Sequence, residues 1–179
     1  SDTFLDKAYD TTGVAATRDL YTNWAASYDD EVSQNGYATP GRCADALKAE
    51  TQDFSAPILD FGCGTGLSGL ALTLAGFSTI DGMDLTQDML DKAAEKRLYR
   101  ALSLSDPSAL FPVKPNDYGV ICAIGVIGAG AAPVQVFDML FDALGQSGKF
   151  VLSYNDHTLE DPEFEARIEL HKSFGGNDA

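Results

Sequence analysis

Three glycines on alternate positions follow a short apolar run in the segment ILDFGCGTG, residues 58–66. Because glycine has no Cβ, such a backbone can turn sharply and approach a ligand closely. Residues 57–61 have the length and apolar character of a buried strand, and the pattern over 67–75 predicts a helix that Gly76 ends. The segment therefore predicts a strand, a tight cofactor-binding loop and a helix in direct succession.

An acidic residue closes the next predicted strand. Asp84 lies eighteen residues beyond Gly66, directly after the run that ends at Met83. A carboxylate only accepts hydrogen bonds, so it can receive both hydroxyl protons of a ribose. Without a ligand, the glycines would form an ordinary tight turn and the carboxylate a loop or helix cap. The spacing between the two features favours the cofactor-binding interpretation.

Short apolar runs alternate with helical patterns along the chain. This alternation predicts an α/β fold, doubly wound (Rossmann-like), with a mostly parallel sheet in strand order 3-2-1-4-5 and additional N-terminal helices. Strands are expected at 57–61, 78–83, 98–104, 120–124 and 149–154. Helices are expected at 17–33, 41–50, 67–75 and 162–173, in a segment capped by Thr86, and between Pro133 and Gly145.

The length of 179 residues is too short for two full domains and sufficient for a sheet covered on both faces. We therefore expect one domain over residues 1–179. Its parts are an N-terminal helical cap over about 1–52, a cofactor-binding core over about 53–155, and a C-terminal helix and tail over about 156–179.

Acidic residues outnumber basic ones by 27 to 12, which gives a net charge of −15. Such a field repels phosphate backbones and anionic lipid surfaces and attracts cations. The charge therefore favours a small-molecule or other non-nucleic-acid acceptor, and it predicts no nucleic-acid or membrane partner. The uncharged stretch 119–137 has the length of a membrane span, but Pro133 and three glycines divide it, and only 120–124 has strand character.

The three cysteines, Cys43, Cys63 and Cys122, form an odd set without CxxC spacing. This pattern argues against a disulfide framework and a zinc site, and no metal ligands are predicted. Residues 1–7 show neither the basic nor the apolar region of a signal peptide. A cytoplasmic location is therefore expected, while the sequence indicates no particular oligomeric state.

Two longer segments carry a family resemblance. ILDFGCGTGLSG (residues 58–69) and IDGMDLTQDML (residues 80–90) resemble the class I S-adenosylmethionine-dependent methyltransferases. Within that class, WAASYDDEV (residues 24–32) and EKRLYRALSLSD (residues 95–106) are similar to the Williams–Beuren syndrome region methyltransferase-like group. The likeness runs over about residues 21–154 and implies a methyltransferase that uses S-adenosyl-L-methionine.

The resemblance also implies a set of cofactor contacts. The backbone of Gly62, Cys63 and Gly64 is expected beside the methionine moiety, with Asp60 near its ammonium group and Asp84 at the ribose. The remaining implied contacts are Leu85 and Asp106 at the adenine, Ile124 and Gly125 after the fourth strand, and Tyr28 closing over the cofactor. An aromatic face near a sulfonium would gain about 0.5–2 kcal/mol of cation–π energy.

The chain departs from the family pattern in three places. Tyr118-Gly119 stands where related sequences commonly have Tyr-Asp, and Pro107 has no N–H to offer an adenine ring. The family sheet normally ends with an antiparallel hairpin, yet only 175–179 follow the last predicted helix. That hairpin is therefore expected to be missing. Either the chain is incomplete at its C-terminus, or the sheet stops at five parallel strands and leaves the fifth strand with an open edge.

The sequence assigns no catalytic residue. Methyl transfer from a sulfonium is an in-line displacement with an activated leaving group, so positioning supplies much of the rate without a general base. His157 is the neutral-pH candidate if a base is used, although a solvated loop histidine is the favoured interpretation of this residue. Two alternatives remain open: a nicotinamide-dependent oxidoreductase with a similar glycine loop, and a cofactor-binding partner module without activity.

Overall fold

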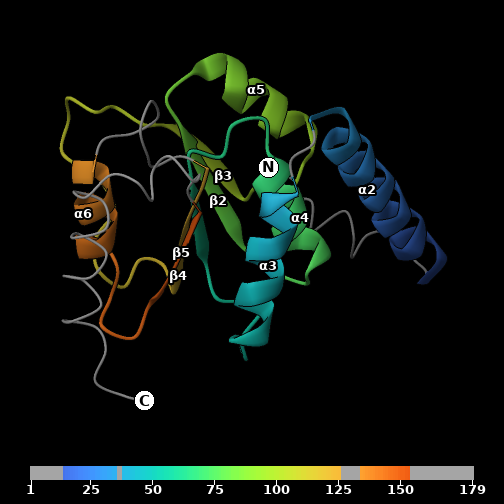
Figure 1. Ribbon diagram of the computed structural model, residues 1–179, viewed down its shortest axis with the longest axis horizontal. Coiled ribbons are helices and arrows are strands. Elements are labelled where there is room, and N and C mark those ends of the chain that lie inside the picture. The colour runs from blue at the N-terminus through green and yellow to red at the C-terminus, as the bar shows by residue number, and fades with distance from the viewer. Residues whose placement is uncertain (1–13, 36–37, 126–133, 154–179) are drawn as a thin grey trace.

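A computed structural model describes residues 14–35, 38–125 and 134–153 of the chain. Within them lies one five-stranded sheet in the order β3-β2-β1-β4-β5, with every neighbouring pair parallel (Figure 1). Its strands are β1 (Ile58–Phe61), β2 (Ile80–Asp84), β3 (Ala101–Leu104), β4 (Val120–Ile124) and β5 (Lys149–Ser153). The predicted fold class and strand order are confirmed.

Helices cover both faces of this sheet, as a doubly wound fold requires. α6 lies on one side, while α3 and α4 lie on the other with α2 outside them (Figure 1). The described helices are α2 (Val14–Asn35), α3 (Thr39–Ala49), α4 (Leu67–Leu74), α5 (Gln87–Glu95) and α6 (Val134–Asp142). None of these helices is long and apolar enough to cross a membrane.

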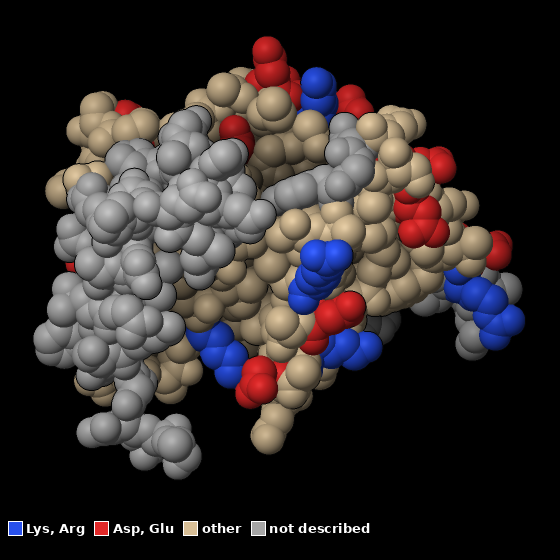
Figure 2. Space-filling model, viewed as in Figure 1, with Lys and Arg blue, Asp and Glu red and all other residues tan. Residues whose placement is uncertain are grey.

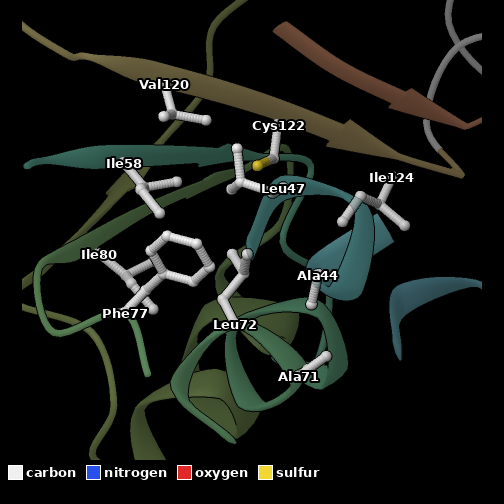
Figure 3. Close-up of a cluster of buried hydrophobic side chains, with 10 residues drawn as sticks. All are labelled: Ala44, Leu47, Ile58, Ala71, Leu72, Phe77, Ile80, Val120, Cys122 and Ile124. Carbon is white, nitrogen blue, oxygen red and sulfur yellow. The ribbon is translucent and has the colours of Figure 1, made fainter. Parts of the chain in front are cut away.

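The core lies between the central strands and the helices on either face. On one face, side chains of α3 and α4 meet those of β1, β2 and β4, as Figure 3 shows for Leu47, Leu72 and Ile58. On the other face, Phe137 and Leu140 of α6 pack against the opposite side of the same strands. Alternate residues of β1 and β4 thus enter two cores, which explains why both strands are apolar apart from Asp60 of β1.

A polar network ties the segment before β4 to the sheet. Asp81 of β2 accepts hydrogen bonds from Arg100 Nε and Nη2 at 3.0 and 2.8 Å and from the Tyr118 hydroxyl at 2.7 Å. Burial raises the pKa of Asp81, but these hydrogen bonds outweigh it and leave the pKa below its usual value. Burial and the Asp81 carboxylate raise the pKa of Tyr118 to about 12. Tyr118 therefore has a structural role, and the departure from the family pattern lies at the next residue, Gly119.

One local difference from the predicted elements is the start of the third strand. Leu98 and Tyr99 belong to the predicted strand 98–104, yet β3 pairs only from Ala101 onwards. Leu98 is buried against Trp24 and Leu70, so its apolar character reflects helix contacts rather than strand pairing. The predicted helix at 162–173 and its capping signals lie outside the described residues.

Candidate cofactor-binding site

The glycine loop joins β1 to α4 at the carboxyl edge of the sheet. Gly62, Gly64 and Gly66 have φ values of 69°, 54° and 95°, in the left-handed region that residues with a Cβ rarely adopt. The N–H groups of Gly62 and Cys63 donate to Met83 O at 2.8 and 3.0 Å. The loop therefore bends over the end of β2, which explains why alternate glycines are needed there.

Asp84 fixes this loop from the end of β2. Its Oδ2 accepts from the Gly64 N–H at 2.9 Å, and its Oδ1 accepts from the Thr86 N–H at 3.2 Å. The carboxylate is half-buried. Each oxygen can accept a second hydrogen bond, so binding the loop leaves acceptor capacity for a ligand. Asp84 thus has the loop-capping role considered from the sequence, and this role is compatible with binding a ribose.

Asp60 lies at the end of β1 with only 1% of its surface exposed. Its Oδ2 accepts from the Ser68 hydroxyl at 2.6 Å and the Tyr99 hydroxyl at 2.7 Å. Its Oδ1 is buried and has no hydrogen-bond partner among the described residues. Burial raises the pKa of Asp60 to about 6, against the hydrogen bonds from Ser68 and Tyr99, and the nearby Asp84 raises it further. One carboxylate oxygen of Asp60 is therefore available to accept a hydrogen bond from a ligand.

Cys63 lies inside the loop and packs against Leu90 and Ala93 of α5. Burial, followed by the charges of Asp60 and Asp84, raises the pKa of its thiol to about 12. A thiol with this pKa stays protonated at neutral pH and is a poor nucleophile. The side chain of Cys63 therefore serves in packing.

Lys96 is a site residue that sequence reasoning missed. Its Nζ donates to Thr65 O in the glycine loop at 2.7 Å and pairs with Glu31 of α2 at 3.0 Å. The sequence showed only a cation towards the end of a predicted helix. Tyr28 of α2 is half-buried, and its hydroxyl lies over Gly41 of α3. α2 is therefore attached to the loop through Lys96 while Tyr28 packs between α2 and α3.

The remaining predicted contacts lie at the carboxyl ends of the strands. Leu85 follows β2 and is 62% exposed, and Asp106 follows β3 and accepts from the Ser108 N–H and hydroxyl at 2.9 and 2.6 Å. Ile124 ends β4 as a buried residue, and the Gly125 N–H donates to Ser153 Oγ at 2.7 Å. These positions line one edge of the sheet, where doubly wound folds bind ligands.

Some expectations about catalysis lie outside the described parts of the chain. His157, the candidate base, is among residues 154–179 and has no described position. Within the described ranges, no group of histidine, cysteine, aspartate and glutamate side chains is arranged to hold a metal ion. Cys43, Cys63 and Cys122 are free thiols.

The parallel sheet, its left-handed glycine loop and the acid at the end of β2 define a class I methyltransferase fold. A family of proteins described as "Methyltransferase domain" matches residues 36–174, and the chain belongs to it. This result confirms the resemblance to the class I S-adenosylmethionine-dependent methyltransferases and S-adenosyl-L-methionine as the cofactor of the family. The nicotinamide-dependent oxidoreductase alternative is thereby removed.

Individual relatives support this assignment. Human Methyltransferase-like protein 27 is 31% identical over 127 residues, which cover 68% of this chain and 51% of that protein. The yeast 18S rRNA (guanine(1575)-N(7))-methyltransferase is 30% identical over 125 residues, covering 62% of this chain and 46% of the relative. The chain spans about half the length of the curated relatives it matches.

A solved structure shows the same fold. The TehB-like S-adenosylmethionine-dependent methyltransferase from Corynebacterium glutamicum superposes with a TM-score of 0.54 at 22% identity. The match covers 84% of this chain and 81% of that structure. At this identity the likeness establishes the architecture alone.

The expectation of a small-molecule or other non-nucleic-acid acceptor, with no nucleic-acid partner, is contradicted by these relatives. Those from yeast, Dictyostelium discoideum and Bos taurus are named as 18S rRNA (guanine-N7)-methyltransferases. The prediction from net charge was wrong because a summed charge does not describe a local contact surface. On the face in Figure 2, acidic and basic side chains of the described residues are interspersed.

Proposed function

We propose that this chain binds S-adenosyl-L-methionine at the carboxyl edge of its sheet and transfers the methyl group to RNA. The observation that carries the cofactor assignment is the glycine loop, held by hydrogen bonds to Met83 O and the Asp84 carboxylate. The RNA assignment is supported by the names of the rRNA-modifying relatives.

The chemistry of the site fits this cofactor. The buried Asp60 Oδ1 is an acceptor without a partner among the described residues, as an ammonium group requires. Asp84 retains acceptor capacity for ribose hydroxyls, and the exposed Leu85 offers an apolar surface to a purine. A Cβ placed on Gly64 would have no atom within 4 Å, so the space above the loop is open to a ligand. When bound, the cofactor supplies a methyl group attached to a sulfonium, and loss of that methyl group leaves a neutral thioether.

The outer contacts complete the proposed site. The backbone of residues 62–64 would lie beside the amino-acid moiety, and Asp106 would accept from the adenine amino group through the oxygen that Ser108 does not use. Ile124 and Gly125 would border the cofactor beyond β4. Tyr28 would present its ring from α2 towards the sulfonium.

A guanine N7 acceptor agrees with the chemistry of methyl transfer. N7 carries an exposed lone pair and no proton, so its methylation requires alignment with the methyl group and no general base. The site residues described here supply alignment through a rigid loop and a fixed carboxylate. The reaction therefore needs no contribution from His157.

Binding of the cofactor predicts a thermal shift. S-adenosylhomocysteine, the demethylated cofactor, should stabilise the protein by about 1.4 kcal/mol at ten times its Kd, since stabilisation follows RT ln(1 + [L]/Kd). For a domain of this size, that corresponds to a Tm increase of about 3–5 °C. Differential scanning fluorimetry with S-adenosylhomocysteine and, as the control, NAD measures the effect. A shift with NAD and none with S-adenosylhomocysteine would contradict the proposed site.

The acceptor proposal predicts methyl incorporation into RNA. The chain with radiolabelled S-adenosyl-L-methionine should label total RNA, and nucleoside mass spectrometry should identify 7-methylguanosine, because N7 is the acceptor named for the relatives. Duplex DNA of matched length serves as the control acceptor. Cofactor binding without label in RNA, with or without label in a small amine, would overturn the RNA acceptor and leave the cofactor assignment intact.

A further inference from the structure

The side chain of Tyr99 lies beneath the glycine loop, although the residue is distant from the loop in sequence. Tyr99 lies between α5 and β3, and its ring packs against the buried clusters that contain Leu70, Leu72 and Cys63. Its hydroxyl donates to Asp60 Oδ2 at 2.7 Å. A tyrosine that reaches the buried acid of the loop is placed to influence what that acid can bind.

Glycines in two other elements make room for this one ring. A Cβ on Gly69 of α4 would overlap the Tyr99 hydroxyl, and a Cβ on Gly82 of β2 would lie 3.0 Å from Tyr99 Cδ1. Glycine inside a helix is normally less favourable than alanine, so Gly69 needs a packing explanation. The close approach of Tyr99 provides it. The position of the hydroxyl is therefore set by packing from both sides.

The two oxygens of Asp60 are used differently. Tyr99 and Ser68 both donate to Oδ2, at 2.7 and 2.6 Å, while Oδ1 is buried with no partner among the described residues. Two donors on one oxygen fix the plane of the carboxylate and favour its ionised form. A fixed, ionised carboxylate with one unused oxygen is suited to a cationic donor.

We propose that Tyr99 is a positioning residue, whose hydroxyl holds the Asp60 carboxylate so that Oδ1 remains available to the ammonium group of the cofactor. This inference rests on the proposed function, in which Asp60 lies near that ammonium group. Tyr99 itself does not contact the cofactor. It acts on the amino-acid half of the ligand through Asp60 and leaves the nucleoside half to Asp84 and Leu85.

The test compares two ligands that differ in the amino-acid half. S-adenosylhomocysteine carries the ammonium group, while 5′-methylthioadenosine has the same nucleoside and lacks the amino acid. Tyr99→Phe keeps the ring and removes only the hydroxyl. We expect this variant to bind S-adenosylhomocysteine at least about fivefold more weakly and 5′-methylthioadenosine within about twofold of wild type, by isothermal titration calorimetry.

Tyr118→Phe is the matched control. The wild-type Tyr118 hydroxyl also donates to a buried aspartate, Asp81, at 2.7 Å. The neighbours of Asp81, Leu59 and Met83, pack towards α6. Removing this hydroxyl should leave the ratio of the two affinities unchanged. An equal loss for both ligands in Tyr99→Phe would identify a merely structural role and overturn the inference.

Gly69→Ala provides a second, independent variant. It retains the Tyr99 hydroxyl and displaces it from Asp60, because the new Cβ occupies the same space. The same selective loss of S-adenosylhomocysteine is expected, and an unchanged ratio in both variants would overturn the inference. If wild type binds neither ligand, the proposed function fails and the inference with it. If wild type binds both ligands and the ratio of the two affinities is the same in the variants as in wild type, the inference alone fails.

The pH dependence adds a readout that a packing defect would not move. S-adenosylhomocysteine affinity in wild type should fall below about pH 6, where Asp60 takes up a proton and Oδ1 ceases to be an ionised acceptor. The groups facing Asp60 are Tyr99, Ser68, Asp84, Cys63 and Cys122. The thiols and Tyr99 have raised pKa values and stay protonated there. Because the Tyr99 hydrogen bond lowers the pKa of Asp60, Tyr99→Phe should move the decline to higher pH.

Discussion

Asp84→Ala is expected to weaken S-adenosylhomocysteine binding by about 1.5–3 kcal/mol, or roughly 10- to 150-fold, because hydrogen bonds to an ionised group contribute that much. The variant removes the proposed ribose acceptor. It also frees the Gly64 and Thr86 N–H groups, which the carboxylate holds at 2.9 and 3.2 Å. Isothermal titration calorimetry measures the affinity, and circular dichroism confirms that the fold persists.

Asp88→Ala is the matched control for this experiment. Asp88 is an exposed carboxylate in the first turn of α5, close in sequence to Asp84. Its loss should cost only the favourable interaction with the helix dipole, about 0.3–1 kcal/mol of stability, without an effect on affinity. Asp84→Asn keeps one acceptor oxygen and should bind with intermediate affinity. A loss below about threefold in Asp84→Ala would reduce Asp84 to a loop cap.

The local signals of the sequence were sufficient for the architecture and for the loop. Alternate glycines predicted a backbone that only glycine adopts readily, and Gly62, Gly64 and Gly66 have positive φ values. Thr86 was predicted to cap α5, and its hydroxyl accepts from the Met89 N–H at 3.4 Å. Such features depend on a few neighbouring residues, so a single sequence reveals them.

The contacts that organise the site came only from the structure. Tyr99 was assigned to a strand because its ring is apolar and precedes β3, whereas its hydroxyl binds an acid 39 residues away. The bond from Lys96 to Thr65 O spans 31 residues in the same way. Neither pairing follows a periodic pattern, because each depends on how α5 packs against the glycine loop.

The acceptor class was the least predictable property. The net charge of −15 is a sum over 179 residues, and RNA is recognised by particular surfaces rather than by that sum. The three relatives named as rRNA methyltransferases are matched over only 46%, 41% and 25% of their own length. The composition of a protein determines its net charge and average electrostatic field, but it does not determine its substrate.

Asp60→Asn is the second variant with a large expected effect, and its effect on stability depends on pH. Burial raises the pKa of Asp60 from 3.8 to about 6 in the folded protein. The folded state therefore binds the Asp60 proton more tightly than the unfolded state. This contribution to stability is fully present below pH 3.8 and is lost as the pH rises through about 6.

The pKa difference of Asp60 between the folded and unfolded states corresponds to about 3 kcal/mol of stability, since each pKa unit is worth about 1.4 kcal/mol. Roughly half of this contribution is lost between pH 5 and pH 7.5. Urea unfolding of ligand-free protein should therefore show wild type gaining stability, on the order of 1 kcal/mol, relative to Asp60→Asn as the pH is lowered across that window. The asparagine can accept from Ser68 and Tyr99 as the carboxylate does. It cannot supply an ionised Oδ1, so S-adenosylhomocysteine binding should weaken in the same variant.

Asp81→Asn is the control, because the pKa of Asp81 is shifted in the opposite direction from that of Asp60. Hydrogen bonds from Arg100 and Tyr118 overcome the effect of burial and hold the pKa of Asp81 below its ordinary value. Its contribution to stability is present above the unfolded pKa and is lost only as the pH falls through the lower folded value. The stability difference between Asp81→Asn and wild type should therefore stay constant from pH 7.5 to pH 5. A constant difference for Asp60→Asn as well would show that Asp60 does not titrate between pH 5 and pH 7.5, and would contradict a pKa raised to about 6 by burial.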